Sequence, residues 1–192
     1  ILSSGVVLFG NTFWKTQDAG FDTKNAILFG EAGKKKYESV REASSDNTSR
    51  FFTREGHFIL RKQDRPAGQE IFVHFDAAPL GYLSIAAHGH ADALSFVLHV
   101  DGHPFITDSG TYTYHTEADW RNYFLSTMAH NTICVDGHNQ AEVAGPTMWL
   151  QHYETEVLAQ ESLPGFDMVL ASHNGYRKKG ITHQRRIYLD KD

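Results

Sequence analysis

Short apolar runs with a period of two dominate the chain from about residue 51 onward. The runs are rich in β-branched and aromatic residues, and Gly, Pro or Asp separates one run from the next, which is typical of strands and turns. No long helical pattern lies between them, so the sequence favours an antiparallel sandwich or barrel. We expect strands at 58–61, 70–75, 83–85, 94–100, 105–107, 132–135, 148–150, 153–159, 168–173 and 187–189.

The tetrapeptide Val-Asp-Gly-His occurs twice, at 100–103 and at 135–138. Asp-Gly between apolar runs is a strong signal for a tight hairpin, because both turn positions tolerate a positive φ. We therefore expect two hairpin tips, with His103 and His138 exposed beside them.

The first 44 residues follow a different pattern. Residues 34–43 are compatible with a helix, and aromatic residues are scattered among glycines that break longer helices. The polar stretch 44–49 is the best boundary, so we expect the end of a helical domain and a connector at 1–44 and a β domain at 45–192. Because the chain starts at Ile1 and a strand lies close to Asp192, we expect it to begin inside a longer protein and the β domain to be truncated at its C-terminus.

Composition narrows the class of function. A chain of 192 residues that is 41% hydrophobic is large enough to bury a core. Its formal net charge of -5 argues against nonspecific binding to nucleic acid, which is usually carried by a basic surface. No apolar run approaches the roughly 20 residues that a membrane-spanning helix needs, so we expect no membrane span.

Potential metal ligands gather between residues 86 and 136. His88 and His90 are two residues apart, Asp108 ends an apolar run, and His130 precedes another. Two His and an Asp are a common ligand set for zinc that leaves a further position open. We therefore predict that His90, Asp108 and His130 hold a metal, while His88 faces a substrate.

This prediction meets a geometric difficulty. If Asp101-Gly102 closes a regular two-residue hairpin, Asp108 pairs with Ser95, and His90 lies five residues further along, or roughly 16 Å at the rise of a strand. The site then requires residues 89–93 to fold back as a loop, a bulge that shifts the register, or Asp92 in place of Asp108 as ligand.

Several motifs occur in an order that resembles the heparinase II/III-like family of polysaccharide lyases. The resemblance covers about residues 51–189, and its motifs are His-Gly-His-Ala-Asp at 88–92, Asp-Ser-Gly-Thr-Tyr at 108–112, Trp-Arg-Asn-Tyr-Phe at 120–124, Ala-His-Asn-Thr at 129–132, Ser-His-Asn-Gly-Tyr at 172–176 and His-Gln-Arg-Arg at 183–186. The resemblance implies an antiparallel β-sandwich preceded by the final helices of an (α/α) toroid domain.

The family resemblance also implies an activity, the β-elimination of acidic polysaccharides such as glycosaminoglycans or alginate. That chemistry needs a neutralised uronate carboxylate, a base for the C5 proton and an acid for the leaving O4. By resemblance, His88 is the catalytic His of the sandwich, and His90, Asp108 and His130 are zinc ligands whose metal fixes it. Part of the active site would come from the toroid, so we expect the isolated chain to be inactive.

Two further residues enter as candidates. Some members of the family use a tyrosine on the sandwich side, for which we choose Tyr114 over Tyr112 and Tyr123. Arg121 has a planar fork that fits oxyanions, and we predict that it binds substrate, with a buried structural ion pair as the alternative.

The rival hypothesis is a non-catalytic module that binds carbohydrate or packs against another domain. Since acidic polysaccharides of this kind lie outside the cytoplasm, the family implies a periplasmic or secreted bacterial protein.

Overall fold

The computed structural model describes residues 2–15, 20–42, 48–63 and 70–192. The chain divides into two compact units, residues 1–47 and 48–192, which we describe separately. The predicted boundary falls at 44–49, of which residues 44–47 lie outside the described residues. No helix in the described ranges is both long enough and apolar enough to cross a membrane.

The first unit is helical. It contains α1 (Leu2–Phe9), a 3₁₀ turn (Thr12–Trp14) and α2 (Thr23–Ser39). Asp22 caps α2, because its side chain accepts a hydrogen bond from the backbone N–H of Asn25 at 2.8 Å. The helix expected at 34–43 forms the last part of α2 and ends at Ser39. That these helices end a toroid domain stays a prediction.

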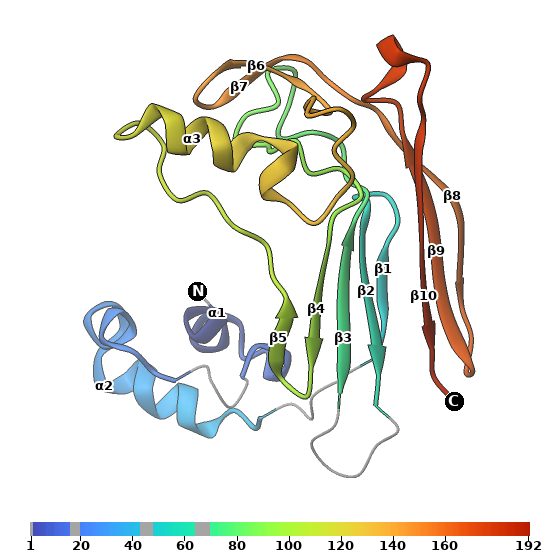
Figure 1. Cartoon of the computed structure of the whole chain (residues 1–192). Helices are drawn as coiled ribbons and strands as arrows, with labels where there is room; N and C mark the ends of the chain where they lie inside the picture. Colours follow the sequence, from blue (N-terminus) through green and yellow to red (C-terminus); the bar gives the residue numbers. More distant parts are fainter. Residues whose placement is uncertain (1, 16–19, 43–47, 64–69) are drawn as a thin grey trace. The chain divides into compact units, whose positions relative to one another are not determined.

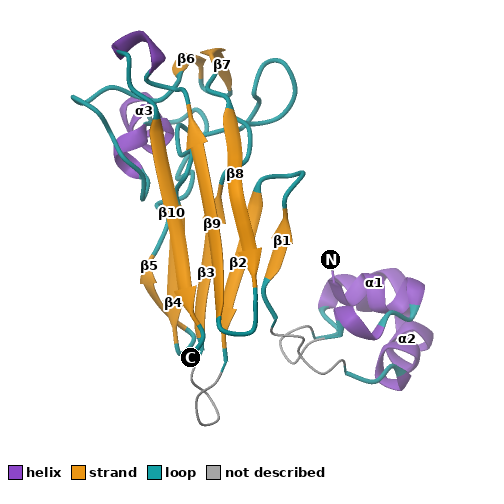
Figure 2. Cartoon of the chain, turned by 90° about the vertical axis from the view of Figure 1, so that its right-hand side faces the viewer, coloured by secondary structure: helices purple, strands orange, loops and turns teal. Residues whose placement is uncertain are grey.

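The second unit is an antiparallel β-sandwich (Figures 1 and 2), which is one of the two architectures that the sequence pattern favoured and the one that the family resemblance implied. Within the described residues, one layer has five strands in the order β1 (Arg50–Phe52), β2 (His57–Lys62), β3 (Ile71–Asp76), β4 (Phe96–Val100) and β5 (His103–Ile106). The other layer has three strands in the order β10 (His183–Asp190), β9 (Phe166–His173) and β8 (Thr155–Ser162).

Alternate residues of these strands form the core between the layers. Phe58 and Leu60 of β2 and Phe75 of β3 are fully buried, and they pack with Val169 and Ala171 of β9. Burying one such large side chain stabilises the fold by about 1.5–3 kcal/mol. The alternation of apolar residues in the sequence therefore correctly predicted which face of each of these strands is buried.

One end of the sandwich carries a cap that the sequence pattern did not predict (Figure 1). It contains α3 (Ala118–Leu125), a 3₁₀ turn (Thr127–Ala129) and the hairpin of β6 (Glu142–Gly145) and β7 (Met148–Gln151). A second hydrophobic cluster lies here and joins this end of the molecule to the loop between β3 and β4. Its buried members are Leu80, Ala86, Ala91, Ala93, Leu125, Ala141, Trp149 and Tyr153.

Two of the expected strands are wrong. Residues 83–85 form a turn in which Leu83 is 72% exposed and has a φ of 56°. Residues 132–135 make only an isolated bridge, from Val135 to His138. The Asp-Gly turn at 101–102 does close the β4–β5 hairpin, and both His103 and His138 are exposed as expected. Short apolar runs do not reveal whether a partner strand lies beside them.

Candidate functional site

The loop between β3 and β4 carries His88, His90 and Asp92. Its backbone is not extended, because Ala86, His88 and Leu94 have φ values of 50°, 61° and 59°. A Cβ atom added to Gly89 would lie 2.8 Å from the backbone N of Gly81, so two segments of the loop approach as closely as glycine permits. The loop folds back on itself at the capped end of the sandwich.

This fold-back removes the distance problem that a regular hairpin would create. A bulge is also present, since Leu98 pairs with Ile106 and His99 pairs with Pro104. The bulge shifts the register by one residue and would place Asp108 level with Phe96 instead of Ser95, which is one residue further from His90. The loop therefore brings the imidazoles and carboxylates together, and the bulge does not.

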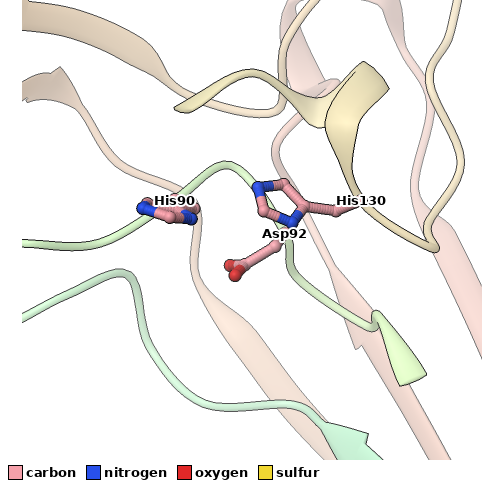
Figure 3. A group of neighbouring side chains, drawn as sticks. All are labelled: His90, Asp92 and His130. Carbon is pink, nitrogen blue, oxygen red and sulfur yellow. The ribbon is translucent and has the colours of Figure 1, made fainter. Parts of the chain in front are cut away.

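Three side chains form the centre of the site (Figure 3). His90, Asp92 and His130 each offer one ligand atom, and these atoms all lie within 4.8 Å of one another. Asp108 lies beside this group, where its Oδ2 is 2.7 Å from Nδ1 of His130. The structure thus brings together both predicted histidines, keeps Asp108 next to one of them and adds Asp92, which the sequence offered as the alternative ligand.

His130 is held by its neighbours on both ring nitrogens. It directly follows the 3₁₀ turn, and its Nε2–H donates to the carbonyl oxygen of Phe124 at 3.0 Å. Because a carbonyl oxygen only accepts, Nε2 must carry a hydrogen, and Nδ1 is the nitrogen that faces Asp108. A second partner of this kind fixes the orientation and tautomer of metal-binding histidines in many proteins.

Burial and neighbouring like charges shift the pKa values of Asp92 and His90. Burial raises the pKa of Asp92 to about 7, and the neighbouring carboxylate of Asp76 adds to the effect. Burial lowers the pKa of His90 to about 4, with further lowering from the charges of His130 and Arg121. His90 is therefore neutral at neutral pH, with a nitrogen lone pair free to bind a cation.

His130 and Asp108 behave as an ion pair. Burial alone would lower the pKa of His130, but its hydrogen bond to Asp108 and the charge of Asp92 raise it. Burial alone would raise the pKa of Asp108. The hydrogen bonds from His130 and from the backbone N–H of Gly110 outweigh this effect, so the pKa of Asp108 is lowered. The two shifts agree in sign with a charged pair.

A cavity of about 480 Å³ opens beside the cluster. His88 and His90 line it together with Asp92. The rest of the wall consists of Glu55, His57, Asp76, Ala78, Pro79, Gly81, Gly89, Thr111 and Tyr153. The site therefore has room for a ligand next to the imidazole of His88.

Tyr114 is the candidate tyrosine that contacts His88. The two rings meet edge to face with their centroids 5.6 Å apart, and Tyr114 is 44% exposed. Tyr112 instead stacks on Phe124, and Tyr123 packs against Trp120. The structure thus places the predicted tyrosine beside the predicted histidine.

Arg121 occupies a different environment from either of the two that we expected. Its side chain is buried, with the residue 2% exposed, which leaves little surface for a polysaccharide. Among the described residues no carboxylate lies within ion-pair distance of it, so the ion-pair interpretation is wrong for this part of the chain. Its Nε and Nη2 donate to the carbonyl oxygen of Pro146 at 2.9 and 2.7 Å.

Sequence reasoning missed some contacts of the cluster. Thr111 Oγ1 lies 3.4 Å from Nε2 of His90, and the Tyr153 hydroxyl donates to the His90 carbonyl oxygen at 3.4 Å. Asp92 carried a usable signal, since it follows His90 at the same interval of two that separates His90 from His88. Thr111 and Tyr153 carry no such local signal, because they reach the site only through tertiary packing.

Comparisons with known protein families, sequences and structures all point to heparinase-like proteins. Residues 45–192 match the family model described as heparinase II/III-like, C-terminal. A heparin-sulfate lyase of Bacteroides thetaiotaomicron is 28% identical over 127 residues, which are 64% of this chain and 18% of that protein.

Solved structures resemble the fold of the chain. A heparinase III gene product superposes with a TM-score of 0.62 at 22% identity, over 86% of this chain and 24% of that one. The heparan sulfate lyase HepC from Pedobacter heparinus gives a TM-score of 0.62 at 19% identity, over the same two shares. The chain thus spans about a quarter or less of the length of these relatives.

Proposed function

Because this chain belongs to the heparinase II/III-like family, whose C-terminal region its residues 45–192 match, we propose that it is the β-sandwich part of a polysaccharide lyase. The substrate would be a uronate-containing acidic polysaccharide. Glycosaminoglycans of the heparan sulfate class are the first candidates, because the named relatives are heparin and heparan sulfate lyases, and alginate is the second.

The contact of Tyr114 with His88, which lines the cavity, carries this proposal. β-Elimination removes the C5 proton of a uronate and protonates the departing O4 oxygen, so it needs two groups that exchange protons near neutral pH. An imidazole and a phenol that touch at 5.6 Å between ring centroids, both accessible from solvent, suit these two roles. We assign His88 and Tyr114 to the proton transfers without dividing base from acid.

The cluster beside them fits a divalent cation, and zinc is our first candidate. Two imidazoles and two carboxylates are ligand types that zinc accepts. Burial raises the pKa of Asp92 and the carboxylate of Asp76 adds to the effect, so the charged form of Asp92 lacks stabilisation that a divalent ion bound to it would supply. His90, Asp92 and His130 would hold the ion with Asp108 beside them, and the ion would take the place of the proton that Nδ1 of His130 shares with Asp108. The ion would also stiffen the loop that carries His88.

The remaining parts of the active site would come from elsewhere. We propose that the chain works with an N-terminal toroid domain, which would neutralise the uronate carboxylate and supply further catalytic groups. Orientation of groups across a cleft supplies much of catalysis, so the 192-residue chain alone should show little or no turnover. A location in the periplasm or outside the cell follows from the substrate class.

The test separates catalysis from metal binding. In the full-length protein, His88→Ala should lower the rate at least 100-fold with little loss of metal, since His88 contributes no atom to the ligand group. His90→Ala removes a ligand, so it should lower metal content and the melting temperature together. Rate is measured as ultraviolet absorbance of the unsaturated uronate released from heparan sulfate, hyaluronan, chondroitin and alginate, and metal by elemental analysis.

Three results would contradict these assignments. Equal metal loss in both variants would mean that the two histidines are wrongly divided. A full-length protein that releases no unsaturated product from any of the four substrates would favour the non-catalytic binding module. Strong turnover by the 192-residue chain alone would refute the need for a second domain.

A further inference from the structure

The backbone at His88 adopts a conformation that must be held in place from outside. Its φ of 61° lies in the left-handed region, which costs a residue with a Cβ atom roughly 1–2 kcal/mol. Such residues persist only where their surroundings determine them. The position of the His88 ring therefore depends on the contacts of its loop.

The hairpin of β6 and β7 supplies several of these contacts. The carbonyl oxygen of Thr147, in the turn of the hairpin, accepts a hydrogen bond from the backbone N–H of His88 at 3.4 Å. In strand β7 of the same hairpin, the indole N–H of Trp149 donates to the carbonyl oxygen of Gly89 at 3.1 Å. The backbone N–H of Trp149 donates to the carbonyl oxygen of Ile85, also at 3.1 Å. The hairpin thus clamps the loop on both sides of His88.

Arg121 fastens that hairpin to α3. Two nitrogens of its guanidinium donate to the carbonyl oxygen of Pro146, the residue before Thr147. Two donors that converge on one oxygen fix both the distance and the plane of the group more firmly than a single bond. The turn that holds His88 is therefore tied to a buried point of the cap.

The same guanidinium lies against the ring of Tyr114. Its central carbon is 4.9 Å from the ring centroid, within the range of a cation–π contact. Tyr114 in turn meets His88 edge to face. Arg121 thus reaches His88 by two routes, one through the hairpin turn and one through the tyrosine ring.

Stability alone does not account for a buried cation at this position. Arg121 is 2% exposed, and its Nη1 finds no hydrogen-bond partner among the described residues. An unsatisfied buried donor costs about 1–3 kcal/mol, more when charged, and well-packed apolar residues often replace buried charges without loss of stability.

We infer that Arg121 is a positioning residue that sets the mutual placement of His88 and Tyr114 through the Pro146–Thr147 turn. It does not touch the substrate. The kinetic test of this inference rests on the proposed lyase function. The spectroscopic test does not require that function.

The kinetic test uses Arg121→Lys and Arg121→Met in the full-length protein. Lysine keeps the charge but loses the planar two-donor fork, so kcat should fall about 10-fold, and methionine should lower it about 100-fold, as expected for a misplacement of about 1 Å. KM should stay within about twofold in both. Ethylguanidinium added to Arg121→Ala should restore part of kcat, because it can refill the site.

Arg61→Lys is the matched control. Arg61 lies over the ring of Phe72 at the same 4.9 Å, on the five-stranded sheet. This substitution should leave kcat and KM unchanged. Melting temperature and metal content are measured for every variant, and loss of kcat only in proportion to loss of folded, metal-loaded protein would overturn the inference, as would wild-type kcat in both Arg121 variants.

The spectroscopic test uses the 192-residue chain. The proton on Cε1 of His88 senses the ring current of Tyr114, so its NMR chemical shift should move in Arg121→Met and not in Arg61→Met. An unchanged shift would overturn the positioning role. If wild-type full-length protein shows no lyase activity while this shift still moves, the proposed function fails and the positioning role stands.

Discussion

At the scale of single residues, His173 and His183 form a buried pair whose protonation follows from their hydrogen bonds. They face each other on β9 and β10, with Nε2 of His173 2.9 Å from Nδ1 of His183. The backbone N–H of Gly175 donates to Nδ1 of His173, so that nitrogen only accepts, and Nε2–H of His173 donates to His183. Both rings are therefore neutral in the folded protein.

This pair predicts a loss of stability in acid. Burial lowers the pKa of His173 and of His183 to about 4, and neighbouring positive charges add to it, against an ordinary value of 6.5. Because the folded pKa is the lower one, the unfolded chain binds more protons between these values, so stability is complete above about pH 6.5 and falls toward pH 4. One such histidine should cost about 2 kcal/mol between about pH 7.5 and pH 5.

Chemical denaturation at the two pH values checks this expectation. His183→Gln should unfold with a visibly smaller difference between pH 7.5 and pH 5 than the wild type. His103→Gln, at the exposed tip of the β4–β5 hairpin, should keep the full wild-type difference. An unchanged pH dependence in His183→Gln would show that the pair is not the source.

At the scale of elements, the loop between β3 and β4 depends on a contact between two stretches of backbone. Gly81 has a φ of 53°, and a Cβ atom there would lie 2.1 Å from the carbonyl oxygen of Ala86. On the opposite side, a Cβ atom on Gly89 would lie 2.9 Å from the Cα of Gly81. The fold-back that gathers His90 and Asp92 is possible because no side chain stands between these segments.

Gly89→Ala should therefore disturb the site as well as the fold. The added methyl group must push the two segments apart, which we expect to destabilise the protein by about 1–3 kcal/mol. At the zinc site that we propose, the affinity for zinc should fall at least 10-fold, since His90 is the next residue. Both are measured on the 192-residue chain, by thermal unfolding and by zinc titration.

Gly102→Ala provides the comparison. Gly102 has a φ of 76° and nothing within 4 Å of an added Cβ atom, so only the backbone conformation opposes the substitution. It should cost about 1–2 kcal/mol and leave the affinity for zinc unchanged. Equal loss of affinity in the two variants would mean that general destabilisation, rather than the loop contact, weakens the site.

At the scale of the whole molecule, each compact unit has a hydrophobic core of its own. Val6, Val7 and Tyr37 form the core of the helical unit, whereas the sandwich is built around residues such as Phe58 and Phe75. A sandwich of this size with two continuous layers meets the usual conditions for independent folding.

Residues 48–192 should therefore fold without the first unit. We expect one cooperative thermal transition within a few degrees of that of the 192-residue chain, and the same zinc content. Phe75→Ala in the shortened chain should lower its stability by about 3–5 kcal/mol, because it empties a fully buried position. Calorimetry checks both statements, and a shortened chain without a cooperative transition would contradict the first.

The class of the β domain could be predicted without coordinates, since the strand pattern indicated antiparallel sheets and the family resemblance implied a sandwich rather than a barrel. Alternation in runs such as 58–61 and 168–173 tells which side chains face the core, because side chains of a strand point to opposite faces in turn. The Asp-Gly dipeptide at 101–102 likewise predicted a hairpin from local backbone preference alone. The order of the histidine and aspartate motifs was enough to identify the family.

The assembly of the site, by contrast, became visible only in the folded chain. Asp92 joins His90 and His130 because glycine contacts fold the loop back, and no periodic pattern reports such a contact between distant backbone segments. Residues 83–85 have the composition of a strand but no partner strand. Arg121 is of a residue type that often binds anionic ligands, but it is buried against the ring of Tyr114. Pairing and burial depend on which remote segments lie alongside, and folding sets these through the whole chain rather than through any one stretch of it.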